Sequence, residues 1–190
     1  MTSEIQEYLL KFRDKIDCDE VRIKEVIKQC LINNPYIISV LNNKELEDAE
    51  AEPDEYFGIN ILPYYQITPT QTDVQNFVCY EINAQNLTRA SQSYKIEQII
   101  FTVLCKNNTI IENNTGISRH DLLAALILDQ FNHTTFIGQR IECVSDIASV
   151  VDDYYACRTL TFKFEKNNNL AKTHDDLTKI INHEVQNLNG

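Results

Sequence analysis

The residues best suited to chemistry in this sequence are Arg119, His120 and Asp121, three consecutive side chains of types that are common in active sites. They could in principle be catalytic. However, they fall in the first turn of a predicted helix, where His120 is free to point to solvent and Asp121 has a capping role. We therefore expect a structural or interface role for Arg119 and Asp121, and no catalytic residue in this motif.

No other constellation in the sequence points to an enzyme. The chain has only four glycines and lacks a glycine-rich phosphate loop, an H-E-x-x-H motif, a nucleophile elbow and paired metal ligands. Its six cysteines are scattered singly through periodic segments, which is typical of small buried hydrophobic residues. We expect neither enzymatic activity nor a cofactor or metal site.

A long strand and a capped helix position the Arg119 motif. Residues 94–105 are rich in Ile, Val, Phe and Tyr, which predicts a strand with Ile99, Phe101, Val103 and Cys105 on one phase. Ser118 stands at the expected N-cap of the helix, and Asp121 would complete a capping box with it. Both elements are apolar on several faces, which indicates a thick core or a neighbouring subunit. The helical stripe consists of Leu122, Leu123, Leu126, Ile127 and Phe131.

The hydrophobic pattern of the whole chain predicts an α+β core domain over residues 1–165. We expect a mostly antiparallel sheet with helices packed on it, in which the last two strands are antiparallel neighbours. The Asn33-Asn34-Pro35 sequence should interrupt the second helix, because the residue before a proline avoids the helical region. Besides the central helix and the C-terminal helix, the predicted helices cover residues 4–16, about 17–32 and 36–41. The predicted strands cover 57–61, 74–82, 94–105, 140–147 and 154–164.

Residues 166–190 are predicted to be a linker and a C-terminal amphipathic helix. A helix of this length alone in water would be mostly unfolded, so something must cover its apolar stripe. We expect it to dock on an adjacent subunit or a neighbouring protein, with packing on its own domain as the alternative. The stripe consists of Leu177, Ile180, Ile181, Val185 and Leu188.

Composition and charge narrow the classes of protein that this chain can be. Its 190 residues are 43% hydrophobic and 24% charged, which is ordinary for a soluble domain, and neither a membrane span nor a signal peptide is evident. The net charge of −11 argues against wrapping nucleic acid. Residues 44–55 form an acidic block, which we interpret as a solvated loop or, alternatively, as the lining of a channel. Its acids include Glu45, Glu47, Asp48, Glu50, Glu52 and Asp54.

The order of elements over about residues 20–165 resembles the tail-terminator or tail-completion proteins of long-tailed bacteriophages. The R-x-D sequence at Arg119 and Asp121, which opens a helix after a long strand, is its most characteristic feature. The other matching segments are the helix from about Val21, Ile61–Tyr64, Phe77–Tyr80, Ile99–Cys105, Gly116–Asp121 and Leu160–Phe164.

The resemblance implies a structural subunit of the virion. Such a protein would form a hexameric ring that closes the tail tube and meets the head-side connector or stopper, with genomic DNA passing through it. It would be assembled in the host cytoplasm. Another head-tail joining protein or a non-viral oligomeric binding module remains the alternative. A guanidinium beside a helix N-terminus meets an unfavourable dipole, so we expect Arg119 to reach an acid within its subunit or across a ring interface.

Overall fold

The computed structural model describes residues 5–7, 9–10, 19–65, 76–85, 94–151 and 154–167. Helices and strands are mixed along this part of the chain, which confirms the predicted α+β class. In chain order the elements are α2 (Asp19–Ile32), α3 (Pro35–Leu41), α4 (Lys44–Asp48), the 3-10 helix η1 (Pro53–Tyr56), β1 (Ile61–Leu62), β2 (Asn76–Gln85), β3 (Tyr94–Lys106), the 3-10 helix η2 (Asn107–Thr109), α5 (Arg119–Phe131), β4 (Glu142–Val150) and β5 (Tyr155–Asn167).

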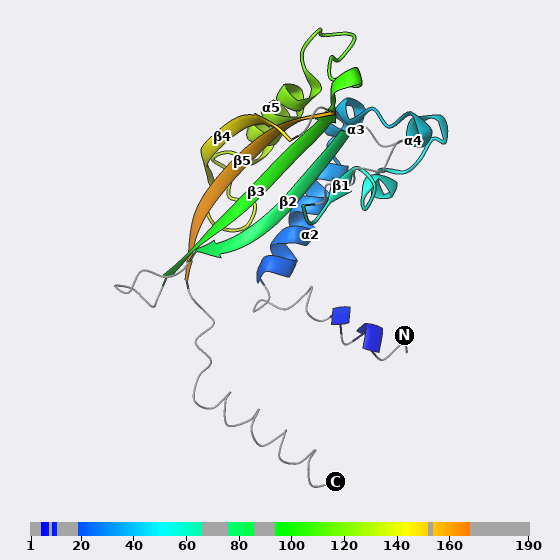
Figure 1. Cartoon of the computed structure of the whole chain (residues 1–190). Helices are drawn as coiled ribbons and strands as arrows, with labels where there is room; N and C mark the ends of the chain where they lie inside the picture. The colour runs from blue at the N-terminus through cyan, green and yellow to red at the C-terminus, as the bar shows by residue number, and fades with distance from the viewer. Residues whose placement is uncertain are drawn as a thin grey trace.

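Within the described residues, five strands form one sheet in the order β1-β2-β3-β5-β4 (Figure 1). β1 runs parallel to β2, and the other neighbouring pairs are antiparallel. The prediction that the last two strands are antiparallel neighbours is therefore confirmed. A register shift between Cys143 and Ser145 places an irregularity in β4, the strand that forms one edge of the sheet.

The main hydrophobic core lies between one face of the sheet and the helices α2, α3 and α5 (Figure 1). The alternating side chains predicted on one phase of β3, from Ile99 to Cys105, are all fully buried in it. Phe101 stacks on Phe131 of α5 with ring centroids 5.0 Å apart, and it meets Phe162 of β5 edge-on at 5.6 Å. These aromatic contacts hold α5 against β3 and its neighbour β5.

The opposite face of the sheet has a smaller hydrophobic cluster, and none of the described helices packs on it. Farther along this face, Ile96 and Ile147 are 37% and 59% exposed. A protein of this size ordinarily covers both faces of such a sheet or leaves the second face polar. The cluster consists of Leu62, Phe77, Cys79, Leu104 and Cys157.

Asn34 separates α2 from α3, as the sequence predicts. Its side-chain oxygen accepts hydrogen bonds from the backbone N–H groups of Tyr36 at 3.0 Å and Ile37 at 3.3 Å, and Pro35 occupies the first helical position. Its amide nitrogen donates to Gln130 of α5 at 2.9 Å. The helix break therefore also ties the N-terminal helices to α5.

The acidic segment at 44–55 is not the loop that we predicted, because it contains α4 and η1. Asn43 caps α4 by accepting a hydrogen bond from the backbone of Leu46, and Glu52 and Glu55 form a capping box at η1. Leu46 packs against the core and Tyr56 is buried, so the segment is anchored at both helices. Helix caps and these two anchors order a stretch whose charge alone suggested a solvated loop.

The strand predicted at residues 57–61 is also wrong for most of its length. Gly58 has a φ of 85°, and its N–H donates to the carbonyl of Ile61, so the chain turns here instead of extending. Only Ile61 and Leu62 pair with β2 as β1.

Two predicted helices, one near each end of the chain, lie largely or wholly outside the described residues. The described parts of the N-terminal helix, residues 5–7 and 9–10, are helical, and the rest of its predicted span at 4–16 lies outside the described residues. The C-terminal helix and its stripe from Leu177 to Leu188 lie outside them entirely. Among the helices that the structure describes, none has the length and apolar character needed to cross a bilayer.

Candidate functional site

The connection between β3 and α5 folds back on itself just before the Arg119 motif. Ile111 and Ser118 form an isolated antiparallel bridge, and the N–H of Arg119 donates to the carbonyl of Ile110 at 2.6 Å. Gly116, with a φ of 68°, makes the reversal between them possible. The loop therefore holds the first residue of α5 against Ile110, in the first part of the same loop.

Arg119 is buried, with 5% of its surface exposed, and it does not form the ion pair that we predicted with another residue of the described chain. Its Nε donates to the carbonyl of Thr109 at 3.0 Å and its Nη1 to the carbonyl of Val40 at 3.1 Å. The guanidinium thus joins the C-terminal end of α3 to the β3–α5 loop. Sequence reasoning anticipated a charged partner because it considered only the helix dipole, whereas the free carbonyls near α3 and η2 supply neutral acceptors.

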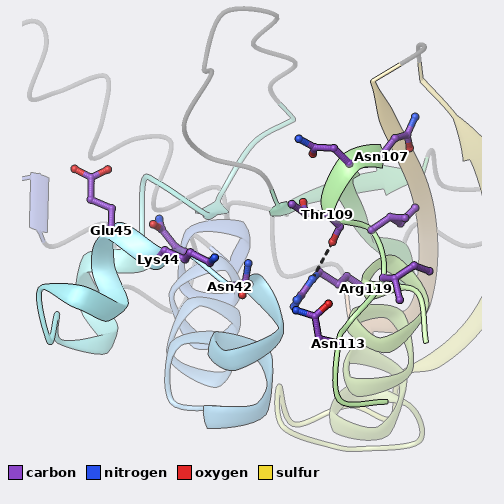
Figure 2. Close-up of a pocket in the computed structure, with 11 residues that line it drawn as sticks. Asn42, Lys44, Glu45, Asn107, Thr109, Asn113 and Arg119 are labelled. Atoms are coloured by element: carbon purple, nitrogen blue, oxygen red, sulfur yellow. Dashed lines mark hydrogen bonds between the residues drawn. The ribbon is translucent and has the colours of Figure 1, made fainter. Parts of the chain in front are cut away.

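Arg119 lines a cleft of about 620 Å³ between the α3–α4 junction and the β3–α5 loop (Figure 2). Asparagine amides predominate in the lining, and Lys44 supplies a second cation. Figure 2 shows Glu45 at the end of the cleft away from Arg119. The asparagine residues are Asn42, Asn43, Asn107, Asn108 and Asn113.

Ser118 occupies the N-cap position of α5, but the predicted capping box is absent. The Ser118 hydroxyl donates directly to the carboxylate of Asp121, and no side-chain capping hydrogen bond to the backbone is formed. The other carboxylate oxygen of Asp121 accepts a hydrogen bond from Arg158 of β5. The hydrogen bond from Ser118, followed by the interaction with Arg158, lowers the pKa of Asp121. Asp121 therefore anchors α5 to the sheet, and its partner Arg158 was not singled out from the sequence.

His120 does not point to solvent as the sequence predicted, because only 15% of its side chain is exposed. Its Nε2 lies 3.6 Å from the Asp121 carboxylate, and its Nδ1 is buried without a hydrogen-bond partner among the described residues. The described residues contain no group of three His, Cys, Asp or Glu side chains placed to hold a metal ion. The hydrogen bonds of Arg119 and Asp121 join α5 to α3, to the β3–α5 loop and to β5.

A ladder of three asparagines, which begins at Asn43 in the cleft lining and continues into the core, is a feature that sequence reasoning missed. Asn43 donates to the side chain of Asn60 at 2.7 Å, Asn60 donates to the carbonyl of Asn76 at 2.9 Å, and Asn76 donates to the carbonyl of Leu41 at 2.8 Å. Asn60 and Asn76 are fully buried. The ladder joins the α3–α4 junction to β1 and β2, and it fixes one wall of the cleft. Nothing in the local pattern distinguishes these residues from the many asparagines in loops.

Comparison with protein-family models gives a match to YomW over residues 34–164. The chain belongs to the YomW family. The family name indicates a phage-associated protein, which agrees with the resemblance of the sequence to bacteriophage proteins. No curated protein matched the chain.

The YomW match covers every element of the site. It begins at Asn34, the cap of α3, and ends at Phe164 in β5, so it includes Arg119, the asparagine ladder and the contact between Asp121 and Arg158. The acidic segment also lies within it, and its acids Glu45, Glu47, Asp48, Glu50, Glu52 and Asp54 are all exposed. The predicted docking residues Leu177, Ile180, Ile181, Val185 and Leu188 lie beyond the match and outside the described residues.

Proposed function

We propose that this YomW-family chain is a ring-forming subunit of the neck of a tailed bacteriophage, where it terminates the tail tube and joins it to the head-side connector or stopper. The observation that supports this best is the free edge of the sheet. β4 pairs only with β5 among the described strands, and it exposes large apolar side chains along its nine residues. The exposed fractions are 48% for Val144, 59% for Ile147 and 72% for Val150.

A long apolar edge strand is a template for association with another chain. Soluble monomers usually protect such an edge with charges, but Asp146 of β4 is engaged by Arg158 of the same sheet. The other edge of the sheet is β1, which has only two residues and is much shorter than β4. A contact that joins β4 of one copy to a different surface of the next copy is heterologous. Heterologous contacts generate closed rings when the rotation between copies closes.

The remaining features fit a ring through which DNA travels. Acidic side chains on α4 and η1 would repel phosphates and prevent a passing duplex from sticking, whereas a basic lining would retain it through counterion release. In this proposal the partners are five further copies of the chain, the tail tube protein and the head-side connector, and the protein is located in the virion.

The test is the mass and symmetry of particles formed by the full chain, alone and with purified tail tubes. Light scattering and electron microscopy should show six copies of the 22.0 kDa chain in a ring, either free or at the end of the tube. Ile147→Lys should prevent assembly, whereas Tyr36→Lys, which replaces a residue that is 70% exposed on α3, should not. A wild-type chain that stays monomeric with tail tubes, or an Ile147→Lys variant that assembles normally, contradicts the proposal.

A further inference from the structure

The guanidinium of Arg119 is a buried cation with an incomplete set of hydrogen bonds. An arginine side chain has five N–H donors, and only Nε and Nη1 have acceptors here, the carbonyls of Thr109 and Val40. Nη2 has no partner among the described residues, and Arg119 lines the cleft with the little surface it exposes. A buried charge that meets only neutral acceptors is costly, and a carboxylate that completes its hydrogen bonds removes much of that cost.

The acids near Arg119 are already engaged elsewhere. Asp121 is held by Ser118 and Arg158. Glu112, in the β3–α5 loop, accepts hydrogen bonds from the backbone N–H groups of Asn114 at 3.1 Å and Thr115 at 2.7 Å. Neither acid lines the cleft. Glu112 feels the Arg119 charge at longer range, but no described carboxylate forms an ion pair with the guanidinium, which faces the open cleft.

The rest of the lining matches the needs of a carboxylate bound on one side by an arginine. The amides of Asn42 and Asn113 offer N–H donors, and Lys44 adds positive charge to the same cleft. Arginine binds carboxylates in a forked geometry with two parallel N–H groups, which makes it selective for this group over a single acceptor. The acid in the lining, Glu45, lies at the far end of the cleft (Figure 2).

We propose that the cleft beside Arg119 binds a carboxylate, which is supplied either by an acidic side chain or by a chain terminus. The guanidinium would pair with this carboxylate through Nη2 and the second N–H of Nη1, while the amides of Asn42 and Asn113 bind the flanking peptide groups. The site is complete within one subunit, so it does not depend on the proposed ring.

The binding is tested on the full-length monomeric or assembled protein with small probes. N-acetylglutamate N-methylamide presents a side-chain carboxylate, N-acetylalanine presents a terminal one, and N-acetylglutamine N-methylamide is the neutral control. NMR titration at constant ionic strength should show saturable shifts of the Arg119 Nε–Hε signal with a carboxylate probe in the millimolar range, and none with the glutamine probe. The carboxylate probe that saturates first identifies the source. If neither carboxylate probe saturates, or if the glutamine probe binds equally, the proposal is wrong.

A substitution in the lining places the test at the cleft without removing Arg119, whose loss could unfold the chain. Asn113→Asp puts a carboxylate into the lining itself, so it should weaken probe binding roughly tenfold, equivalent to about 1.4 kcal/mol. It should also raise the melting temperature by roughly 2–4 °C by pairing the buried cation. Asn83→Asp makes the same charge change on an exposed residue of β2 and should do neither. Equal probe affinities for the two variants would overturn the assignment of the site to this cleft.

Discussion

Arg158 of β5 holds Asp146 of β4 in a forked ion pair, with 2.7 Å from Nε to Oδ1 and 2.8 Å from Nη2 to Oδ2. Its third nitrogen, Nη1, donates to Asp121 at the start of α5. The two carboxylates raise the pKa of the guanidinium, with the hydrogen bond to Asp146 as the largest cause. One side chain thus joins the edge strand, its neighbour and the helix that begins at the Arg119 cleft.

Replacement of Arg158 should destabilise the fold, and the loss of stability should grow with the number of its hydrogen bonds to Asp146 and Asp121 that are removed. Arg158→Lys keeps the charge but loses the paired geometry, and should lower the free energy of unfolding by about 1 kcal/mol. Arg158→Gln leaves the carboxylates of Asp121 and Asp146 without their shared cation, and should cost roughly 2 kcal/mol. Urea denaturation measures both. Lys163→Gln on the same strand is the control, and a loss as large as that of Arg158→Gln would show that charge alone matters.

Asp121 should make stability depend on pH in the acidic range. Its pKa is lowered in the folded state by the hydrogen bond from Ser118 and the interaction with Arg158, so the folded protein binds this proton less readily than the unfolded chain. The resulting stabilisation is fully present above the ordinary value of 3.8 and is lost as the pH falls through the lowered folded value.

The comparison is between wild type and Asp121→Asn by chemical denaturation from pH 6 to pH 2.5. The wild type should be more stable at pH 6, and the difference should shrink below about pH 4. Asp129→Asn removes one exposed acid from the same helix and serves as the control. A difference that is constant across this range would exclude the proposed role of the Asp121 charge.

The asparagine ladder should be sensitive to truncation at its middle. Asn60→Ala removes the acceptor of Asn43 and the donor to Asn76 in a fully buried position, and should cost about 2–3 kcal/mol. Asn83→Ala, on an exposed part of β2, should change the free energy by less than about 0.5 kcal/mol. Thermal melts of both variants provide the measurement, and equal losses would mean that the ladder contributes no more than a surface amide.

The acidic segment yields a prediction about DNA. If α4 faces the channel of a ring, neutralisation of its acids should increase retention of duplex DNA and steepen the salt dependence of binding. The first variant replaces Glu45, Glu47 and Asp48 with their amides. The matched control replaces Asp129, Glu142 and Glu165, which are exposed on other elements. Filter binding at several salt concentrations compares them, and equal retention by the two variants would place α4 outside the channel.

The sequence by itself determined the α+β class, the start of the central helix at Ser118, the break at Asn34 and the buried phase of β3. These features follow from local rules, since side-chain periodicity, caps and proline act over a few residues and need no distant partner. The same rules failed at residues 44–61, where short helices and a turn depend on the anchors Leu46 and Tyr56 in a core assembled from distant segments.

Only the tertiary structure decided the partners of the polar side chains. Arg119 is followed in the sequence by His120 and Asp121, yet its acceptors are the carbonyls of Val40 and Thr109, and Asp121 pairs with Arg158, 37 positions away. Hydrogen bonds of this kind are selected by which backbone and carboxylate groups the packed helices and strands bring within about 3 Å. The spacing of residues in the sequence does not predict which groups come this close. The residue types therefore identified Arg119 and Asp121 as candidates, but only the packing determined their partners.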